Sequence, residues 1–418
     1  MNKYVIIGNG ISSVGCIEGI RSVDKEGSIT VIAREPYATY ARPLISYYLE
    51  GMTDTERMKY RDDDFYQKNN VEVYYGTTAT SIDQGTRKIF LEGEGAPEYV
   101  EYDKLCIATG SDPFVPPFEG LDTVPKKHSF ITLDDALELE KDIDAESNVL
   151  IVGAGLIGLK CAEGLAHRVG HITVCDLADR VLSSILDNRL AAKMQKVLEA
   201  EGIEFMLGNS VKTFDGNRAT MNDGTLVDFD VLVLAVGVKA NTALASEIGC
   251  DVNRGIVVDS HLQTSVENVW AVGDCSEGYD MSLGANRVLA ILPNAFMQGE
   301  CAGQNMAGAD ASFDNAIPMN SIGFFGFHAM SAGSYVTEED GGQVYEQSNG
   351  DNIKQFFVKD NKLMGYMLVG DVTRGGIYTS LIRNQTDLDS VDFDYMMKAS
   401  SLAGFDKKVR QEKLATQV

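Results

Sequence analysis

Two short stretches of this 418-residue chain place glycines at intervals that suit phosphate binding. In the first stretch, the apolar run KYVII leads into Gly8 and Gly10, and a small residue, Ser13, takes the third position. Gly8 permits a tight turn, and Gly10 lets a pyrophosphate approach backbone N–H groups at the start of the following helix. Glu35 ends the next strand-like run, where a carboxylate accepts hydrogen bonds from a ribose. The stretch predicts a strand, a turn and a helix that hold a dinucleotide.

The same pattern returns in SNVLIVGAGLIGLKCAEGLAHR, with Gly153, Gly155 and Gly158 after a second apolar run. Asp176 ends the following strand-like run, ITVCD, and is placed for a second ribose. Its charge would repel a 2′-phosphate, which favours NAD over NADP, although Arg180 lies close by and weakens that preference. Two complete units with acids in place predict two dinucleotides, a flavin dinucleotide and a nicotinamide dinucleotide.

The elements that must position these residues are strands and helices in alternation, the pattern of an α/β protein. A length of 418 residues predicts two or three domains, and 44% hydrophobic residues with 41 glycines fit a globular, turn-rich chain. The formal charge of −25 opposes binding to nucleic acid or to an anionic membrane. No window holds the roughly 18 unbroken apolar residues of a membrane span. The chain enters a strand at once, without a signal peptide, so a cytoplasmic location is expected.

The seven cysteines are scattered, and no two have the spacing of a redox CxxC pair, a zinc site or an iron–sulfur site. No metal site is therefore expected. Most of the cysteines stand in apolar runs such as LCIATG and ITVCDL, where a buried, inert thiol is the expectation.

Further stretches follow the glycine turns in a definite order. They are CIATGS (106–111), LAVGVKANTAL (234–244), TSVENVWAVGDCSE (264–277) and LPNAFMQGECAGQNMAG (292–308). Together with the two turns, they make the chain resemble the two-dinucleotide flavoproteins, also called the pyridine-nucleotide-disulfide oxidoreductase family, over nearly all of residues 1–390. The resemblance implies FAD as the bound cofactor and NAD(P)H as substrate, with NADH preferred. It also implies an α/β fold with two Rossmann-like dinucleotide-binding domains, three-layer sheets and a small C-terminal α+β domain.

The resemblance also assigns binding residues. In relatives the aspartate of the third stretch, here Asp274, holds the ribityl chain of the flavin. The helix of the fourth stretch points its N-terminus at the pyrimidine edge of the ring, where the helix dipole stabilises negative charge. The residues expected to contact FAD are Gly8, Gly10, Ser13, Glu35, Arg42, Ala79, Thr109, Gly110, Gly273, Asp274 and Leu292. The residues expected to contact NADH are Gly153, Gly155, Gly158, Asp176 and Gly237.

Between residues 35 and 51 the chain carries YATYARPLISYYL, with four tyrosines and no cysteine. Disulfide reductases of the family place two redox cysteines in this part, and its peroxidases and oxidases place one, so no thiol relay is expected here. The segment instead resembles the Arg-Pro-x-x-Ser stretch of rubredoxin reductases, oxygenase-coupled ferredoxin reductases and assimilatory nitrite reductase. By that likeness Arg42 and Pro43 lie against the flavin and act in catalysis. Three of the tyrosines are expected to be ordinary packing residues, namely Tyr40, Tyr47 and Tyr48.

One departure from the ferredoxin reductases concerns a charge pair beside the flavin. Those relatives carry a lysine at the position of Tyr47 and a glutamate at the position of Lys160, and these two side chains pair with each other. In this chain the carboxylate is missing, and a lysine stands on the other side of the pair. We expect Lys160, paired with Glu163 on the next turn, to act in catalysis by positioning the nicotinamide and stabilising hydride charge. A solvent-facing helix lysine is the alternative.

The pattern of residues along the chain changes at Ile317. Alternating residues on both sides of a KDNK turn predict an antiparallel hairpin, and GGIYTSLIRNQTDL predicts a helix. This part resembles the C-terminal module of rubredoxin and nitrite reductases. The expected organisation is a FAD-binding domain in two parts (1–112 and 243–316), a nicotinamide-binding domain (113–242), a C-terminal α+β domain (317–395) and a basic tail (396–418). The tail is expected to be a frayed, solvated end.

The expected function follows from these assignments. Hydride passes from NADH to FAD, and the electrons leave, without a redox-active cysteine, for an iron protein such as rubredoxin or ferredoxin. Three alternatives stay open. The chain could instead be the nucleotide-binding flavoprotein subunit of a larger redox complex, an NADH oxidase, or a redox-sensing interaction protein that binds FAD and NADH.

Overall fold

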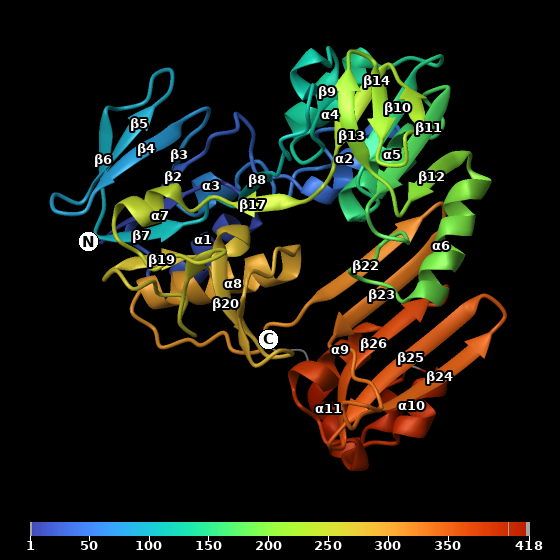
Figure 1. The fold of residues 1–418 in the computed structure, drawn as a ribbon. Helices are drawn as coiled ribbons and strands as arrows, with labels where there is room; N and C mark the ends of the chain where they lie inside the picture. The colour runs from blue at the N-terminus through green and yellow to red at the C-terminus, as the bar shows by residue number, and fades with distance from the viewer. Residues whose placement is uncertain (1, 400, 415–418) are drawn as a thin grey trace. The chain divides into compact units, whose positions relative to one another are not determined.

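The computed structural model describes residues 2–399 and 401–414, except for the side chains of residues 412 and 413. The chain forms two compact units (Figure 1). The larger unit comprises Met1–Gly278 and Asn286–Phe313, and the smaller unit comprises Tyr279–Ala285 and Asp314–Val418. Both glycine turns therefore belong to the larger unit, and the KDNK hairpin belongs to the smaller one.

Five parallel strands form the first sheet of the larger unit, in the order β19-β7-β1-β2-β3. They are β1 (Lys3–Ile7), β2 (Ser28–Ile32), β3 (Val71–Tyr74), β7 (Lys104–Ile107) and β19 (Val269–Ala271). The central strand β1 pairs with β2 and β7, and its apolar residues are buried because an inner strand of a parallel sheet is covered on both faces. A strand near residue 270 thus completes a sheet that begins at residue 3.

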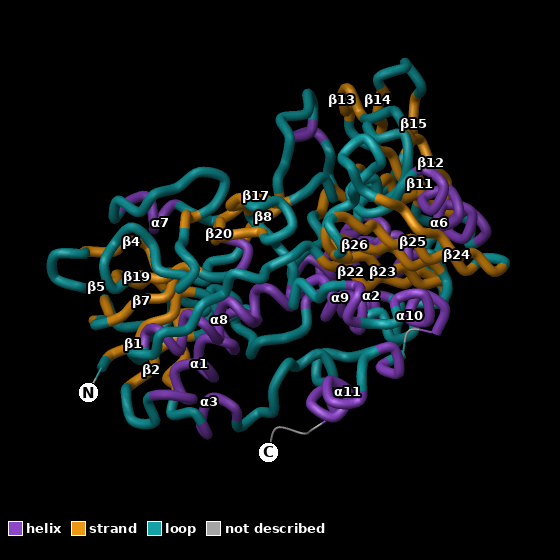
Figure 2. Tube along the Cα trace, turned by 90° about the horizontal axis from the view of Figure 1, so that it is seen from below, coloured by secondary structure: helices purple, strands orange, loops and turns teal. Residues whose placement is uncertain are grey.

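Helices α1 (Ile11–Val23) and α8 (Leu292–Met306) pack side by side next to this sheet (Figures 1 and 2). A methyl group at Gly15 or Gly19 would clash with backbone atoms of α8, and one at Gly299 or Gly303 would clash with backbone atoms of α1. The two helices therefore touch backbone to backbone, which explains why both carry glycine at a cost in helix propensity.

The second sheet of the larger unit follows the same plan, with parallel strands in the order β12-β11-β10-β16-β9. The strands are β9 (Lys127–His128), β10 (Asn148–Val152), β11 (His171–Asp176), β12 (Ile203–Leu207) and β16 (Val231–Leu234). Its helices are α4 (Leu133–Asp142), α5 (Leu156–Leu165) and α6 (Asn188–Ala200). As in the first sheet, the central strand is the one that leads into a glycine turn and a helix.

Smaller elements complete the larger unit. Antiparallel sheets accompany both parallel sheets, formed by β4 (Thr78–Asp83), β5 (Lys88–Glu92) and β6 (Tyr99–Glu101) and by β13 (Val211–Asp215), β14 (Arg218–Met221) and β15 (Leu226–Asp228). The remaining strands are β8 (Ser111–Pro113), which pairs with β17 (Val238–Ala240), and the set β18 (Ile256–Val257), β20 (Ser276–Asp280) and β21 (Ala285–Arg287), of which Tyr279–Ala285 belongs to the smaller unit. The short helices are α2 (Ile45–Leu49), α3 (Phe65–Lys68) and α7 (Ala243–Glu247), with single 3-10 turns at Arg42–Leu44, Leu121–Thr123 and Gly273–Cys275.

An antiparallel sheet of five strands, in the order β22-β23-β26-β25-β24, forms the centre of the smaller unit. Strands β25 (Asn352–Lys359) and β26 (Lys362–Val369) make the predicted hairpin, and both residues of its turn, Asp360 and Asn361, have positive φ. The predicted helix is α9 (Gly376–Arg383). The other elements are β22 (Met319–Phe324), β23 (Phe327–Gly333), β24 (Gln343–Asn349), α10 (Phe393–Ala399), α11 (Lys407–Leu414) and 3-10 turns at Leu388–Ser390 and Leu402–Gly404.

The expected start of a solvated tail at residue 396 was wrong. Helix α10 crosses that boundary, and Met396, Met397 and Phe405 are buried in the same core as Tyr366 and Tyr378. These apolar side chains hold the segment on the unit even though lysines stand between them. The side chain of residue 413 and residues 415–418, also assigned to the tail, lie outside the described residues. The division of the larger unit into FAD-binding and nicotinamide-binding domains stays a prediction.

Candidate functional site

The first glycine turn connects β1 to α1. Gly8 has φ +111°, and a methyl group there would clash with the carbonyl oxygen of Ala108 just after β7, so only glycine fits. A Cβ on Gly10 would meet no atom of the described residues within 4 Å, which leaves this backbone open to a ligand. The Ser13 hydroxyl donates a hydrogen bond to the Gly8 carbonyl (2.6 Å) and closes the turn.

The second glycine turn connects β10 to α5 and repeats this geometry. Gly153 has φ +119°, and a methyl group there would clash with the carbonyl oxygen of Ala235, just after β16. Around Gly155 the space is open, as it is around Gly10. Gly158 lies so close to the start of its own turn that a methyl group would clash with the Gly153 carbonyl oxygen.

Asp176, at the end of β11, accepts hydrogen bonds from backbone N–H groups with both of its carboxylate oxygens. One donor lies in the second glycine turn, and the other lies two residues after Asp176. Oδ2 accepts a hydrogen bond from the N–H of Ala154 (2.7 Å), and Oδ1 accepts one from the N–H of Ala178 (2.7 Å). Arg180, whose charge weakened the preference for NAD, pairs with its neighbour Asp179 (2.9 Å). The contact of Asp176 with a ribose stays a prediction.

The helices after the two turns begin without a side-chain cap. Their N-caps, Gly10 and Gly155, bring no side-chain acceptor, and neither α1 nor α5 has an acidic residue in its first turn. Helix α8 begins at Leu292 in the same way. Helices α4 and α6, by contrast, are capped by the side chains of Thr132 and Asp187. Because the first N–H groups of a helix need an acceptor, three helix starts fit the phosphates and ring carbonyls of dinucleotides.

The loops after β7 and β19 meet near the first turn. A Cβ on Gly273 would lie 2.9 Å from the Ser12 hydroxyl oxygen, so the loop after β19 touches the start of α1. Asp274 accepts a hydrogen bond from the Ser111 hydroxyl (2.9 Å). Burial raises the pKa of the Asp274 carboxyl, although the Ser111 hydrogen bond and the charge of Arg42 oppose this shift. A half-buried carboxylate that holds a hydroxyl is suited to a polyol such as a ribityl chain.

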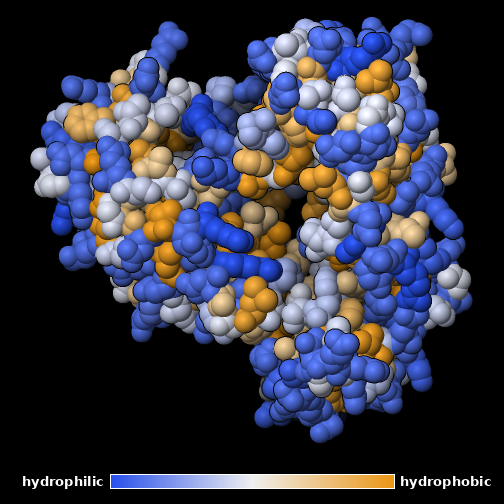
Figure 3. All heavy atoms as spheres, viewed as in Figure 1, coloured by the Kyte–Doolittle hydropathy of each residue, from blue (hydrophilic) through white to orange (hydrophobic). Residues whose placement is uncertain are grey.

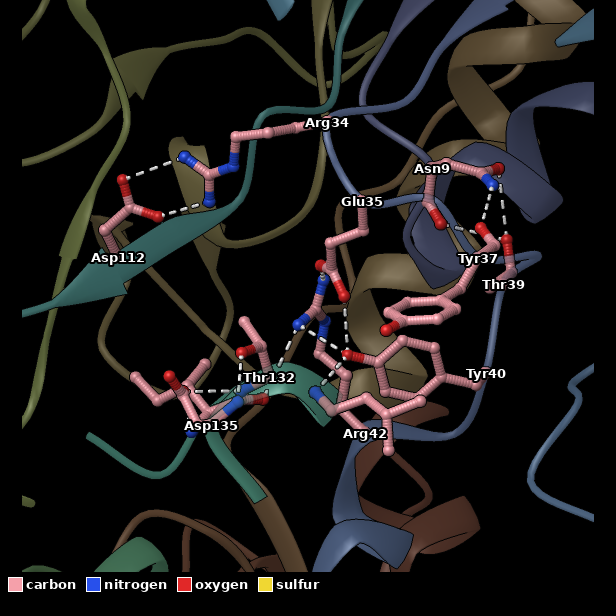
Figure 4. A network of polar contacts seen from close by, with 12 residues as sticks. Asn9, Arg34, Glu35, Tyr37, Thr39, Tyr40, Arg42, Asp112, Thr132 and Asp135 are labelled. Atoms are coloured by element: carbon pink, nitrogen blue, oxygen red, sulfur yellow. Dashed lines mark hydrogen bonds and ion pairs between the residues drawn. The ribbon is translucent and has the colours of Figure 1, made fainter. Parts of the chain in front are cut away.

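The Arg-Pro segment lies between β2 and α2. The Arg42 guanidinium points at the Glu35 carboxylate and forms an ion pair with it (Figure 4). The other carboxylate oxygen accepts a hydrogen bond from the Tyr40 hydroxyl (2.7 Å), which accepts one from Arg42 in turn (3.2 Å). Glu35 is therefore joined to the Arg-Pro segment, and its expected contact with a ribose stays a prediction. Pro43 takes the second position of the 3-10 turn.

Lys160 is not solvent-facing. Its side chain is 19% exposed, its ammonium lies 2.5 Å from a carboxylate oxygen of Glu163, and the predicted pair is therefore present. The ammonium also lies 4.8 Å from the centre of the Tyr47 ring, within the range of a cation–π interaction. Where the ferredoxin reductases were expected to have a lysine–glutamate pair, this chain has a lysine held by an aromatic face and by a carboxylate on its own helix.

The remaining predicted residues lie at turns and strand ends. Gly110, Gly237 and Gly273 have φ of +65°, +114° and +76°, and the Thr109 hydroxyl donates to the Asn241 carbonyl (2.7 Å). Ala79 is buried on β4, in the antiparallel sheet rather than at a glycine turn. The structure brings together the first turn with the loops after β7 and β19, and the second turn with Asp176. The binding roles of all these residues stay predictions.

Two amide side chains at the first turn were missed. The side-chain oxygen of Asn9, between the two turn glycines, accepts a hydrogen bond from the Tyr66 hydroxyl (2.8 Å). The Thr39 hydroxyl donates to the Asn9 carbonyl (2.9 Å), as Figure 4 shows for these two residues. The Gln298 side chain accepts a hydrogen bond from the N–H of Gly273 (2.8 Å). The place of Asn9 between two glycines is a signal that could have revealed it, whereas Gln298 stands in an ordinary helical pattern.

Among the described residues, no group of three or more His, Cys, Asp or Glu side chains could hold a metal ion. No helix in the described part is both long and apolar enough to cross a membrane. All seven cysteines are free and buried, which confirms the prediction of buried thiols. The face seen in Figure 3 is mostly hydrophilic, with smaller apolar areas between.

Comparison with protein families identifies this arrangement. The model described as "Pyridine nucleotide-disulphide oxidoreductase" matches residues 2–299. The chain belongs to this family. A second model, described as "Rubredoxin NAD+ reductase C-terminal domain", matches residues 318–386. The matches confirm the predicted fold class and the expected cofactor and substrate, so the chain is a FAD-dependent NAD(P)H oxidoreductase.

Three curated relatives match this chain over most of their own length, whereas the match covers only 48% of a nitrite reductase from Bacillus subtilis. The epsilon subunit of an NADH-dependent phenylglyoxylate dehydrogenase from Aromatoleum evansii is 34% identical over 394 residues, which cover 92% of each chain. An NADH oxidase from Methanocaldococcus jannaschii is 32% identical and covers 88% of this chain and 87% of its own. A rubredoxin-NAD(+) reductase from Alcanivorax borkumensis is 26% identical and covers 90% of this chain and 96% of its own.

Solved structures show the same fold. A ferredoxin reductase from Rhodopseudomonas palustris superposes with a TM-score of 0.84 at 23% identity, covering 99% of this chain and 100% of its own. At this identity the likeness supports the fold of the chain rather than its partner.

Proposed function

We propose that this chain takes hydride from NADH and, through bound FAD, delivers electrons to a small iron protein such as rubredoxin or ferredoxin in the cytoplasm. The match of residues 318–386 to a rubredoxin reductase C-terminal domain carries this proposal. The segment after Glu35, which holds Arg42 and Pro43 but no cysteine, supports it because electrons then leave without a thiol relay. When bound, FAD links the two-electron chemistry of hydride to the one-electron chemistry of iron.

The first turn and its neighbours would hold FAD. The uncapped N–H groups after Gly10 bind a pyrophosphate, and Asp274 accepts hydrogen bonds from ribityl hydroxyls. The N-terminus of α8, at Leu292, places its positive dipole end where negative charge on the reduced ring is stabilised. Arg42 adds a full positive charge, which Glu35 and Tyr40 hold in one orientation.

The second turn would hold NADH. The N–H groups after Gly155 bind the pyrophosphate, and Asp176 stabilises the turn while its charge disfavours a 2′-phosphate. Lys160 lies on the helix that follows, where Tyr47 and Glu163 restrict its ammonium. In this position it orients the nicotinamide and stabilises charge that develops during hydride transfer.

A second function is favoured by one observation. The relative with 34% identity over 92% of both chains is named as a subunit of an NADH-dependent dehydrogenase. The chain would then exchange electrons with a partner subunit rather than with a diffusing iron protein. The 32% identity to an NADH oxidase favours oxygen as a third acceptor.

Reoxidation kinetics test the acceptor. The FAD-loaded chain is reduced with one equivalent of NADH under anaerobic conditions and then mixed with rubredoxin, with ferredoxin or with air-saturated buffer in a stopped-flow instrument. We expect an iron protein to reoxidise the flavin at least about tenfold faster than oxygen does, because the segment after Glu35 has no cysteine for peroxide chemistry. Faster reoxidation by oxygen would contradict the proposal, and a hydride-transfer rate unchanged by Lys160→Ala would remove Lys160 from it.

A further inference from the structure

The segment of residues 37–50 is called the tyrosine segment below, and Tyr40, Tyr47 and Tyr48 in it were expected to be ordinary packing residues. Three of its four tyrosines instead donate a hydrogen bond to a carboxylate. The pairs are Tyr37 with Asp134 (2.6 Å), Tyr40 with Glu35 (2.7 Å) and Tyr48 with Glu140 (3.0 Å). Charge-assisted hydrogen bonds of this kind are stronger than hydrogen bonds between neutral groups. The segment is therefore held by these bonds as well as by packing.

Two of these tyrosines hold the start of α4. The Tyr37 hydroxyl reaches Asp134 in the first turn of the helix. The Tyr40 hydroxyl accepts a hydrogen bond from the first helical N–H, that of Leu133 (2.8 Å), while it donates to Glu35. Arg42 adds a long hydrogen bond to the carbonyl of Ile131, just before the helix (3.5 Å).

The third tyrosine holds the far part of the same helix. Glu140 lies six residues after Asp134, about 9 Å farther along the helix axis. Its carboxylate accepts one hydrogen bond from Tyr48 and a second from Arg168 (2.9 Å), which also donates to the carbonyl of Leu49 (2.8 Å). The tyrosine segment is therefore fixed along α4 at two separate places.

The tyrosine segment also touches α5, the helix that follows the second glycine turn. A Cβ on Gly164 would lie 2.8 Å from the Ser46 carbonyl oxygen and 3.2 Å from the Leu49 side chain. One turn earlier on α5, Lys160 lies over the Tyr47 ring. Both helices that the segment contacts flank the second parallel sheet, whereas the segment itself leaves the first parallel sheet at the end of β2.

The phenols stay protonated, and so remain donors, across the working range of pH. The hydrogen bond to Asp134, together with burial, raises the pKa of Tyr37 to about 12. Burial, with a smaller contribution from Glu140, raises the pKa of Tyr48. The hydrogen bonds from Tyr37 to Asp134 and from Tyr48 to Glu140 are thus present at any pH at which the two carboxylates are ionised.

We propose that Tyr37 and Tyr48 are positioning residues for hydride transfer, which hold α4, and with it the second parallel sheet, in register with the Arg-Pro segment. This inference rests on the proposed function, since it needs NADH at the second turn and FAD at the first. Hydride transfer requires the reacting atoms about 3–3.5 Å apart, so a small shift between the two sheets lowers the rate. Neither tyrosine bonds Glu35 or Arg42, so their loss separates alignment from cofactor binding.

The test compares Tyr37→Phe, Tyr48→Phe and the double variant with the parent chain, all loaded with FAD. The rate of flavin reduction by NADH is measured anaerobically in a stopped-flow instrument, together with FAD content and reduction by dithionite. We expect the double variant to lose about tenfold or more in the limiting reduction rate, with a larger primary isotope effect from NADH deuterated at C4. FAD content and dithionite reduction should be unchanged.

Two controls keep the inference falsifiable. Tyr74→Phe removes a tyrosine of β3 whose pKa is raised by burial and by a hydrogen bond to Glu72, away from α4, and should leave the reduction rate unchanged. Asp134→Asn keeps an oxygen that accepts from Tyr37, so it should retain more of the rate than Asp134→Ala does. A double variant that is reduced at the parent rate, even with a lower melting temperature, would overturn the inference, and so would an equal loss in Tyr74→Phe. A parent chain that NADH does not reduce would overturn the proposed function and this inference together.

Discussion

The turn at Gly8 and the turn at Gly153 have almost the same backbone. The φ angle is +111° at the first and +119° at the second, and the N-caps of the following helices have φ of −88° and −82°. In both turns a neighbouring strand end excludes a side chain at the first glycine, and the space over the second glycine is open. Identical backbone requirements thus produce the same conformation twice.

The side chains that hold the two turns differ. The first turn is closed by the Ser13 hydroxyl, from its own helix, and Tyr66 braces it through the side chain of Asn9. The second turn is held by Asp176, which binds the N–H of Ala154, and by the close approach of its own helix. A fingerprint of glycines therefore specifies the path of the backbone, while the means of holding it varies from one copy to the other.

The largest effect should come from placing the third residue of the first turn into the second. In Gly158→Ser the new Cβ would clash with the Gly153 carbonyl oxygen, because α5 lies closer to its turn than α1 does. We expect a loss of about 3 kcal/mol in the free energy of unfolding, measured by urea denaturation, and weaker NADH binding. The reverse exchange, Ser13→Gly, serves as control. Equal losses in the two variants would show that the turns do not differ in packing.

A smaller effect is expected from neutralising the two acids. Asp176→Asn leaves one acceptor oxygen for two backbone N–H donors, and its amide would face one of them. We expect about a tenfold loss of affinity for NADH, and no gain of NADPH binding that compensates, because the turn itself is weakened. Glu35→Gln should lower FAD affinity less, because its partners are side chains that can reorient. Fluorescence titration measures the NADH affinity of Asp176→Asn and the FAD affinity of Glu35→Gln. A switch of preference to NADPH by Asp176→Asn alone would contradict the prediction that the turn itself is weakened.

The first turn also has a neighbouring carboxylate, Asp274, whose pKa is raised by burial. A carboxyl whose pKa is higher in the folded state than in the unfolded state stabilises the fold while it is protonated. This contribution to stability is complete below the unfolded pKa, about 3.9, and is lost as the pH rises through the folded pKa. At neutral pH the buried charge is therefore unfavourable. We expect flavin-free Asp274→Asn to be more stable than the parent at pH 7, with the difference vanishing below about pH 4.

The same variant should bind FAD more weakly, since an amide accepts fewer hydrogen bonds from the ribityl chain than a carboxylate does. Thermal denaturation as a function of pH measures the gain in stability of the flavin-free variant. Flavin titration measures its loss of FAD affinity. A difference in stability that does not depend on pH would assign the effect to packing instead.

The smallest effect concerns the closing hydrogen bond of the first turn. Ser13→Ala removes the donor to the Gly8 carbonyl but keeps a Cβ, so it should cost about 1 kcal/mol of unfolding free energy and little FAD affinity. Urea denaturation with and without FAD measures this. A loss as large as that of Gly158→Ser would mean that the hydroxyl, rather than the backbone, sets the turn.

Features that depend on neighbouring residues were predicted correctly. The strands, the glycine turns, the hairpin at Asp360 and Asn361, and the pair of Lys160 with Glu163 all arise within a few residues of sequence. Local conformational preferences and helical spacing determine them, so their signal is present in the sequence itself.

Features that depend on distant residues were missed. Tyr48 finds Glu140, and Tyr37 finds Asp134, only because the tertiary fold brings α4 to the tyrosine segment. Tyrosine also packs well without a partner for its hydroxyl, so the pattern alone favoured ordinary packing. The burial of Met396 and Met397 was missed for a similar reason, since the lysines near them dominated the composition.

The backbone contact between α1 and α8 has a consequence for the order of assembly. The strands of the second sheet end at residue 234, whereas the glycines of α1 meet their partners only when residues up to 303 exist. During synthesis from the N-terminus, the second glycine turn can thus be finished while the first turn, although made earlier, still lacks its supporting helix. A ribosome stalled before residue 292 would carry a chain whose second turn is complete and whose first turn lacks the helix that packs against α1.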